Sequence, residues 1–252
     1  MNAFSEDFSF DFYKRIVDIS KSIGSIVSMA DYEKLSNKEG IFFIWRHDID
    51  VSLDYALKMA KIEQSLDISS TYMFIPDYSL YRIKEIKNQK IIREIEDMGH
   101  EIGLHFDINS MNSNNKNVQN INTAIYRDLD KLNQITSSKV NSISFHRPIK
   151  EFLYGEKYIC GCLNAYSKEL MEFYISDSKG SWRDGNPLHS IVSKDFKVAQ
   201  ILTHPIWWSD INISPIEKLN QIKLEKSKVL SVIQYNEFKK KLDINLPGVT
   251  QK

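Results

Sequence analysis

Most histidines of this chain lie in short segments that also carry acids, arginines or aromatic residues. Five of the six histidines belong to such segments. In chain order the segments are Arg46-His47-Asp48-Ile49-Asp50, Gly99-His100-Glu101-Ile102-Gly103-Leu104-His105, Ser144-Phe145-His146-Arg147-Pro148, Ser176-Asp177 with Trp182, and Leu202-Thr203-His204-Pro205. Imidazoles and carboxylates are the side chains that transfer protons and bind divalent metals near neutral pH. The segments therefore predict proton-transfer chemistry around a metal site, provided that the fold brings them together.

The two acids of the first segment are two residues apart. Side chains alternate between the faces of a strand, so Arg46, Asp48 and Asp50 share one face, and His47 lies on the other, where we expect it to pack. Two carboxylates this close repel each other unless a cation or a shared proton compensates. A divalent metal on one carboxylate, with the other acting as a base, meets that need. A capped or hydrogen-bonded strand end is the alternative interpretation of any single segment, but five in series favour a site.

Apolar, strand-like runs precede or contain these segments and must position them. Apolar residues at helical spacing, with N-cap signals, alternate with these runs. We predict helices over 12–23, 28–35, 52–66, 83–98, 118–135 and all or part of 164–172, strands over 25–27, 41–50, 70–75, 101–106, 141–145, 173–177 and 198–203, a polar loop over 109–117, and closing helical segments over 216–230 and 232–242. The βαβα alternation favours a mostly parallel sheet or barrel, with the acids and histidines at its strand ends.

Composition limits the classes of function. The 252 residues carry 33 Lys and Arg against 33 Asp and Glu, and this net charge of zero argues against a nucleic-acid binder or a membrane-surface protein. The hydrophobic fraction of 42% supports a sizeable core, and no linker or repeat divides residues 1–252, so we expect one domain that closes with the helical segment 214–252. No apolar run reaches membrane-spanning length, and the acidic start lacks an apolar leader, which predicts a cytoplasmic protein. We expect Cys160 and Cys162 to be reduced thiols.

Taken in order, the five segments resemble the motifs of carbohydrate esterase family 4, the NodB-homology polysaccharide deacetylases. The resemblance covers residues 43–208, and its specificity comes from the ordered set rather than from any one motif. It implies an α/β fold, a single distorted (β/α)7-type barrel with the active site at the C-terminal ends of the strands. Arg-His-Asp-Ile-Asp, Ser-Phe-His-x-Pro, Tyr-Ile-Ser-Asp-Ser and Leu-Thr-His-Pro-x-Trp-Trp resemble more narrowly a deacetylase-like branch associated with bacterial surface-glycan biosynthesis.

The resemblance also implies roles for individual residues. The general base of the family falls on Asp48 and its first metal-binding acid on Asp50. A metal-binding histidine falls on His105. The Leu-x-His motif places the general acid at His204, and the fourth motif supplies Asp177 as its partner. Sugar contacts are expected from residues beside the motifs, namely Arg147, Trp182 and Trp207.

Three departures from the family pattern concern the metal site. Asn109 stands where the family has its second metal-binding histidine, His146 replaces an arginine that orients the base, and Ile49 separates the two acids of the first motif. The third ligand is therefore His146, or Asp107 or Asn109, or the site has two protein ligands completed by water or substrate. Imidazole and carboxylate donors favour zinc, with nickel, cobalt and iron as alternatives.

These features predict a metal-dependent hydrolase that removes an N-acyl group, most simply acetyl, from an amino sugar. The expected substrate is a nucleotide-linked sugar or a lipid-linked glycan of bacterial surface-glycan biosynthesis. One alternative is a barrel that has lost deacetylation and serves as a sugar-binding or scaffold protein. Another is a hydrolase of a different amide or ester, such as a formamide. Outside the motif positions, we expect His100 to be a structural hydrogen-bonding residue and His189 to lie on the surface.

Overall fold

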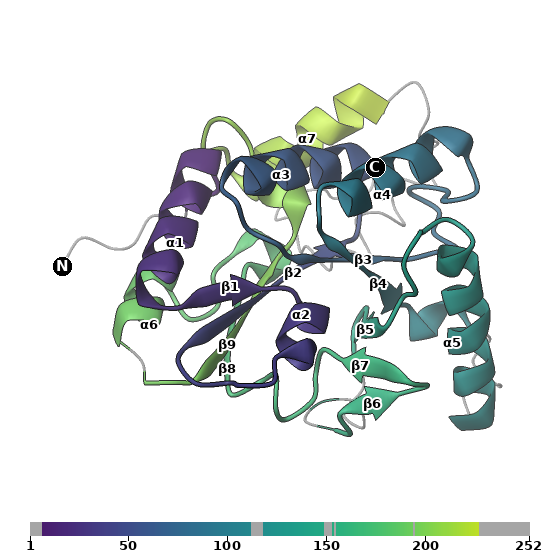
Figure 1. The fold of residues 1–252 in the computed structure, drawn as a ribbon. Coiled ribbons are helices and arrows are strands. Elements are labelled where there is room, and N and C mark those ends of the chain that lie inside the picture. The colour runs from purple at the N-terminus through teal and green to yellow at the C-terminus, as the bar shows by residue number, and fades with distance from the viewer. Residues whose placement is uncertain (1–6, 112–117, 149–152, 154, 194, 227–252) are drawn as a thin grey trace.

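The computed structural model describes residues 7–111, 118–148, 153, 155–193 and 195–226. Helices and strands alternate along most of this chain (Figure 1). The helices are α1 (Phe10–Ile23), α2 (Met29–Lys34), α3 (Leu53–Ser65), α4 (Ile86–Asp97), α5 (Val118–Asn133), α6 (Pro187–Ser193) and α7 (Pro215–Lys226). The strands are β1 (Ser25–Val27), β2 (Phe42–Ile49), β3 (Thr71–Phe74), β4 (Glu101–Phe106), β5 (Ser142–Phe145), β6 (Tyr158–Ile159), β7 (Cys162–Asn164), β8 (Phe173–Ser176) and β9 (Val198–Thr203).

Parallel strands form one curled sheet in the order β7-β5-β4-β3-β2-β9-β8. Read around a circle, this is the order of the strands along the chain, as in a barrel. Among the described strands β7 and β8 do not pair with each other, so the barrel is open along that seam. β6 runs antiparallel to β7, and β1 pairs with the first half of β2 while β3 pairs with the second half. The expected distorted (β/α)7-type barrel is confirmed, in an open form.

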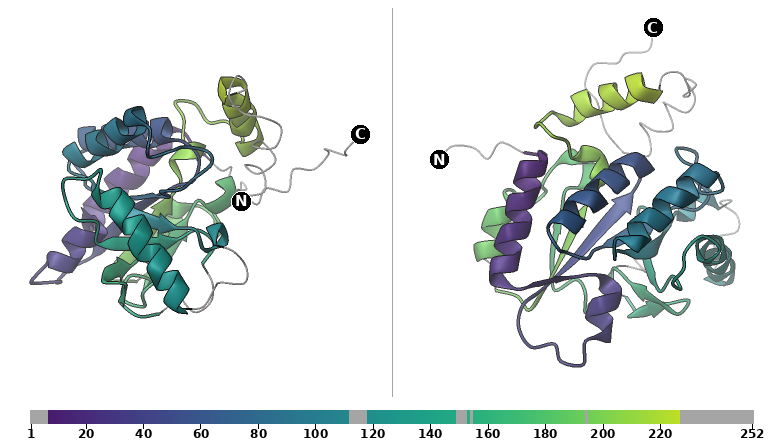
Figure 2. Two further views of the ribbon diagram at one scale, coloured as in Figure 1. Left: turned by 90° about the vertical axis from the view of Figure 1, so that its right-hand side faces the viewer. Right: turned by 45° about the horizontal axis from the view of Figure 1, so that its top comes forward.

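The central strand β2 lies inside the fold. Every residue of β2 is buried, because β3 and β1 lie along one of its edges, β9 lies along the other, and helices cover the outside. Figure 1 shows α1, α3, α4 and α5 around the strands, and Figure 2 shows α7 beside α3. The hydroxyls of Ser9 and Ser28 accept backbone N–H groups at the starts of α1 and α2 and so set where these helices begin.

Most predicted elements are confirmed, but the helix predicted over 164–172 is wrong. The chain there ends a hairpin, in which Cys160 and Gly161 both have positive φ between β6 and β7. Two such residues form the tight turn that fits the twist of an antiparallel pair. The Asn164 side chain then accepts the Tyr166 N–H at 3.0 Å and directs the chain into turns rather than a helix.

Other differences lie at element ends. α4 begins at Ile86, three residues after the predicted start at Ile83. α7 confirms the first part of the expected closing helical segment, and residues 227–252 lie outside the described part of the chain. The same is true of residues 112–117 of the predicted polar loop. Cys160 and Cys162 are free thiols, as expected.

Candidate active site

Five side chains that can carry chemistry lie at the carboxyl ends of the parallel strands. Asp50 follows β2, His105 lies in β4, His146 follows β5, Asp177 follows β8 and His204 follows β9. Four of these residues are at most 8% exposed, and the His204 side chain is 12% exposed. The carboxyl ends of parallel strands lie at one end of a barrel, and segments far apart in sequence therefore converge there. The structure thus brings the predicted site residues together at this end of the barrel.

Asp50, His105 and His146 form the centre of this arrangement. The same carboxylate oxygen, Asp50 Oδ1, lies 3.2 Å from His105 Nε2 and 3.3 Å from His146 Nδ1. Among the described His, Cys, Asp and Glu residues, this is the one group of three whose candidate ligand atoms all lie within 4.8 Å of one another. Oxygen and nitrogen ligands of a tetrahedral zinc ion lie about 3.3 Å apart, because each is about 2.0–2.1 Å from the metal.

Unsatisfied atoms in this group also fit a cation. Asp50 Oδ1 and His146 Nε2 are buried and make no hydrogen bond with acceptable geometry, although Asp50 Oδ1 is close to two ring nitrogens. Burial favours the neutral acid, but His146 and His105 outweigh it and hold the pKa of Asp50 well below its usual range. Asp50 is therefore an ionised carboxylate whose Oδ1 faces two imidazoles without a well-formed hydrogen bond, and such oxygen and nitrogen ligands suit a divalent metal.

Ser144 links the metal group to the neighbouring acid. Its hydroxyl donates to Asp48 Oδ1 at 3.3 Å and lies 2.6 Å from His105 Nδ1. A serine hydroxyl carries one hydrogen, so when it donates to Asp48 it accepts the Nδ1–H of His105. In that arrangement a neutral His105 carries its lone pair on Nε2, the nitrogen that faces Asp50. Hydrogen bonds of this kind orient metal-binding histidines.

Asp48 forms an ion pair with Arg46, which is fully buried. Arg46 Nε lies 3.1 Å from Asp48 Oδ1, and Arg46 Nη2 donates to Asp48 Oδ2 at 3.2 Å. Arg46 Nη1 donates to Gln200 Oε1 at 2.7 Å, and Nη2 also donates to the Tyr166 hydroxyl at 3.3 Å. The two acids of the first motif therefore face different partners, an arginine for Asp48 and two imidazoles for Asp50. Each acid thus has basic neighbours of its own, and these reduce the repulsion between the Asp48 and Asp50 carboxylates.

The sequence analysis placed Arg46 on the same strand face as Asp48 but gave Arg46 no role. The alternation of side chains along the strand could have indicated that Arg46 pairs with Asp48. The arginine that the family uses to orient its base is absent from the third motif, where His146 stands. Here an arginine of the same strand as Asp48 makes that contact instead.

His204 and Asp177 form a second pair beside the metal group. His204 Nδ1 lies 2.6 Å from Asp177 Oδ1, and the His204 backbone N–H donates to both carboxylate oxygens at 2.9 and 3.0 Å. The Trp208 indole donates to Asp177 Oδ2 at 2.9 Å. Burial alone would lower the pKa of His204, but the Asp177 carboxylate outweighs it and raises the pKa to about 9. His204 Nε2 faces Asp50, at 3.7 Å from Oδ2.

Of the other expected ligands, Asp107 lies outside the group of three. Asp107 Oδ1 accepts the Asn109 backbone N–H at 2.9 Å and caps the 3-10 turn Ile108–Ser110. The geometry therefore favours His146 over Asp107 as the third ligand. Arg147 follows His146 and is exposed, with a φ of 58°.

Two expected sugar contacts need correction, because the indoles of Trp182 and Trp207 are buried. Trp182 is 4% exposed and Trp207 is 2% exposed. Trp182 stacks on Phe8 at 6.0 Å between ring centroids and meets Trp208 edge-on at 6.0 Å. Neither indole presents a face on which a sugar can stack, and both instead support the segment that carries His204. Nothing in the spacing of the motifs distinguished these buried rings from rings on a surface.

Comparisons with known proteins concern the fold. No protein-family model and no curated protein matches the chain. A CE4 family pseudoenzyme from Bacillus anthracis has a TM-score of 0.45 at 14% identity over 78% of this chain and 66% of its own. A family 4 carbohydrate esterase from Bacillus anthracis has a TM-score of 0.43 at 14% identity, over 89% and 91%. The peptidoglycan deacetylase PdaC from Bacillus subtilis has a TM-score of 0.42 at 13% identity, over 82% and 95%. The chain is similar to these proteins in fold.

Proposed function

We propose that this protein is a metal-dependent hydrolase that removes an N-acyl group, acetyl in the simplest case, from an amino sugar. The observation that carries the proposal is the meeting of three units at one end of the barrel. They are the group Asp50–His105–His146, the base candidate Asp48 and the pair His204–Asp177. Amide hydrolysis needs these three functions together, since it requires an activated water, a polarised carbonyl and a protonated leaving group.

The metal would be held by Asp50, His105 and His146. Two imidazoles and one carboxylate are ligands of catalytic zinc sites, which leave a further position open, and nickel, cobalt and iron accept the same donors. When bound, a divalent metal supplies Lewis-acid polarisation of the acyl carbonyl and of water. Ser144 contributes by fixing the tautomer of His105.

Asp48 accepts the proton of the attacking water in this proposal. It lies beside the metal group, with Oδ2 3.8 Å from His105 Nε2. Arg46 on one side and the Ser144 hydroxyl on the other fix the orientation of its carboxylate. A base held on rigid elements in this way does not need to reorganise during proton transfer.

His204 donates the proton to the departing amine. Asp177 is held by the His204 backbone and by Trp208, and it fixes the imidazole through Nδ1. His204 Nε2 is thereby directed at the metal group, as its 3.7 Å distance from Asp50 Oδ2 shows. The proton donor and the base candidate are separate side chains on different strands, which suits a reaction that takes one proton and gives another.

The substrate in this proposal is a small nucleotide-linked or lipid-linked N-acyl amino sugar of bacterial surface-glycan biosynthesis. The zero net charge supports it, since the protein lacks a strong overall field that would attract an anionic polymer. Exposed Arg147 beside His146 is the candidate for binding a phosphate of the carrier. None of the described helices combines the length and the apolar character needed to cross a bilayer.

The test combines metal analysis with an acyl-release assay. Purified protein is analysed for bound metal and then incubated with N-acetyl and N-formyl amino sugars, free, nucleotide-linked and lipid-linked, while free acid is measured. We expect about one metal per chain and release of acetate, both lost in Asp50→Ala. Asp18→Ala, an exposed acid on α1, is the matched control and should change neither.

Each other outcome assigns a different function. Bound metal with formate release only would identify a formamide hydrolase. Bound metal with release of acid from esters alone would identify an esterase. Neither metal nor acid release would contradict the proposal and favour a sugar-binding or scaffold protein.

A further inference from the structure

The contacts of Arg46 lead from the base candidate to the open seam of the barrel. Arg46 is fully buried and keeps its charge, so its N–H groups need acceptors within the protein. Asp48 faces one edge of the guanidinium, with 3.1 Å to Nε and 3.2 Å to Nη2. The other acceptors are Gln200 of β9 and Tyr166 of the turns 165–172, which connect β7 and β8. The orientation of Arg46 therefore depends on residues far from it in sequence.

Gln200 is fully buried, and its contacts define which way its amide points. Its Nε2 donates to the carbonyl of Ala165 at 2.8 Å and to the carbonyl of Leu170 at 3.1 Å. An amide NH₂ has two hydrogens, so both are used by these two carbonyls. Its Oε1 accepts from Arg46 Nη1 at 2.7 Å. The reversed amide would place N–H groups against the guanidinium, so the turns 165–172 determine that the oxygen of Gln200 faces Arg46.

Tyr166 makes the second link between these turns and the guanidinium. Its hydroxyl accepts from Arg46 Nη2 at 3.3 Å and donates to the carbonyl of Phe145 at 3.3 Å. Arg46 Cζ also lies 4.9 Å from the centre of the Tyr166 ring, within the range of a cation–π contact. Phe145 is the last residue of β5, so one buried side chain connects the turns to Arg46 and to the strand that precedes His146.

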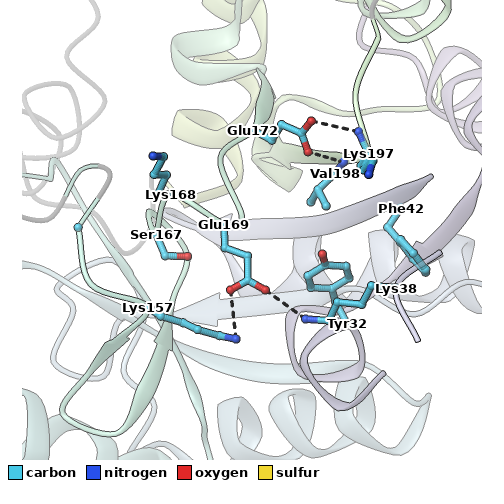
Figure 3. A pocket seen from close by; sticks show the side chains of 11 residues that line it. Tyr32, Lys38, Phe42, Lys157, Ser167, Lys168, Glu169, Glu172, Lys197 and Val198 are labelled. Atoms are coloured by element: carbon cyan, nitrogen blue, oxygen red, sulfur yellow. Dashed lines mark hydrogen bonds and ion pairs between the residues drawn. The ribbon is translucent and has the colours of Figure 1, made fainter. Parts of the chain in front are cut away.

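Side chains on the other side of the turns hold them in place. Glu169 lies between Lys38 and Lys157, at 3.1 Å from each ammonium group (Figure 3). Glu172 accepts two backbone N–H groups at the start of β9, at 3.2 and 3.0 Å. Both acids line the pocket that Figure 3 shows. Because β7 and β8 do not pair among the described strands, these contacts fix the segment 165–172 where strand pairing would do so in a closed barrel.

We propose that residues 165–172 position the base candidate Asp48 through Arg46. Gln200 and Tyr166 are the positioning residues, because they link the segment to the guanidinium. This inference deepens the proposed function and rests on it, since Asp48 is the base of that reaction. The open seam makes the arrangement possible, because carbonyl groups in turns can bind a side chain, whereas carbonyl groups within a sheet bind the neighbouring strand.

The effect on the reaction follows from the oxygen that Arg46 binds. Asp48 Oδ2 accepts from Arg46 Nη2 and is also the oxygen that lies 3.8 Å from His105 Nε2. A guanidinium that rotates would move this oxygen relative to the metal group. A displacement of about 1 Å can cost about 10²-fold in rate, even when its cause lies away from the reacting atoms.

The first test is NMR of the full chain labelled with ¹⁵N-arginine, which needs no activity. A guanidinium held on several acceptors rotates slowly about its Cζ–Nε bond, and its two Nη groups then give separate signals. We expect separate signals for Arg46, identified by their loss in Arg46→Lys. Gln200→Met keeps the length of the side chain without the amide, and Tyr166→Phe removes only a hydroxyl. Each should broaden or merge the two signals.

The second test measures bound metal and acetate release in the same variants. Gln200→Met should lower kcat about 10–100-fold, and Tyr166→Phe should lower it less, while KM and bound metal stay unchanged. Arg46→Lys should also lose kcat despite its charge, since an ammonium group cannot hold three acceptors in one plane. Tyr158→Phe is the control, because it removes the hydroxyl of a half-exposed tyrosine that binds Glu33 and should change neither measurement.

The outcomes separate this inference from the proposed function. Merged Nη signals in the wild type would overturn the inference. So would unchanged signals or unchanged kcat in both Gln200→Met and Tyr166→Phe, and Tyr166→Phe alone decides if Gln200→Met does not fold. A wild type that releases no acid from any substrate would contradict the proposed function, while the NMR signals would still decide whether residues 165–172 hold Arg46.

Discussion

Glu63 of α3 is a fully buried acid. Its substitution leads to a quantitative prediction about the stability of the protein. Its Oε1 binds the Tyr13 hydroxyl and lies 2.8 Å from His47 Nε2. Its Oε2 accepts the hydroxyls of Ser70 at 2.6 Å and Tyr72 at 2.7 Å. Four groups thus surround one carboxylate, which ties α1, β2 and β3 to α3. His47 is the neighbour of Asp48, so this network also holds the strand that carries the base candidate.

Substitution by glutamine removes the charge and keeps the shape. Burial by itself would raise the pKa of Glu63, but His47, His100 and Ser70 outweigh it and lower the pKa to about 2 from an ordinary 4.5. A shift of about 2.5 units corresponds to about 3 kcal/mol of preference for the ionised form in the folded protein. The neutral amide of Glu63→Gln loses this preference and also turns an N–H toward groups that donate. We therefore expect unfolding free energy to fall by about 3 kcal/mol or more at pH 7.

The pH dependence has a definite sign. The folded pKa lies below the unfolded one, so the contribution of Glu63 is fully present above about pH 4.5 and is lost as the pH falls toward 2. With these two values, the advantage of wild type over Glu63→Gln shrinks by about 2 kcal/mol between pH 7 and pH 3. Other acids titrate in both proteins, so their effects cancel in the difference.

Urea denaturation at pH 7 and pH 3 measures both quantities. The matched control is Glu94→Gln on α4, whose partner Lys61 lies 2.8 Å away with both side chains about half exposed. An exposed pair of this kind contributes at most about 1 kcal/mol. If Glu63→Gln is as stable as Glu94→Gln at pH 7, or if its deficit is unchanged at pH 3, the carboxylate is not the stabilising charge that its contacts indicate.

The remaining predictions concern the metal group. Asp50→Ala should lose metal, whereas Asp48→Asn should keep it and lose about 10²–10⁴ in kcat; equal metal loss would make both acids ligands. His146→Ala should weaken metal binding in equilibrium dialysis while Asp107→Ala does not, and the reverse result would exchange their roles. Ser144→Ala should lower metal affinity about 10–100-fold and also reduce kcat, since one hydroxyl contacts both His105 and Asp48. Unchanged metal affinity would limit Ser144 to orienting the base.

Local rules explain what the sequence could predict. Alternation along a strand placed Arg46, Asp48 and Asp50 on one face of β2 and His47 on the other, and the structure confirms this division. Apolar, strand-like runs predicted β1, β4 and β9 at their observed bounds. These signals act over a few residues and need no knowledge of the rest of the chain. The ordered motifs predicted the barrel, because parallel strands bring their ends together.

Tertiary structure decided which of these residues meet. The hairpin of β6 and β7 depends on two residues with positive φ. The open seam beside it depends on which strands pair with each other. Apolar periodicity predicts neither feature. Whether the ring of Trp182 is buried or exposed depends on Phe8, far away in sequence. His146 joins the metal group, in which the candidate ligand atoms lie within 4.8 Å of one another, whereas Asp107 caps a turn. Distances of that size arise from packing of the whole sheet, so the sequence limited the ligands to a few candidates and the fold selected among them.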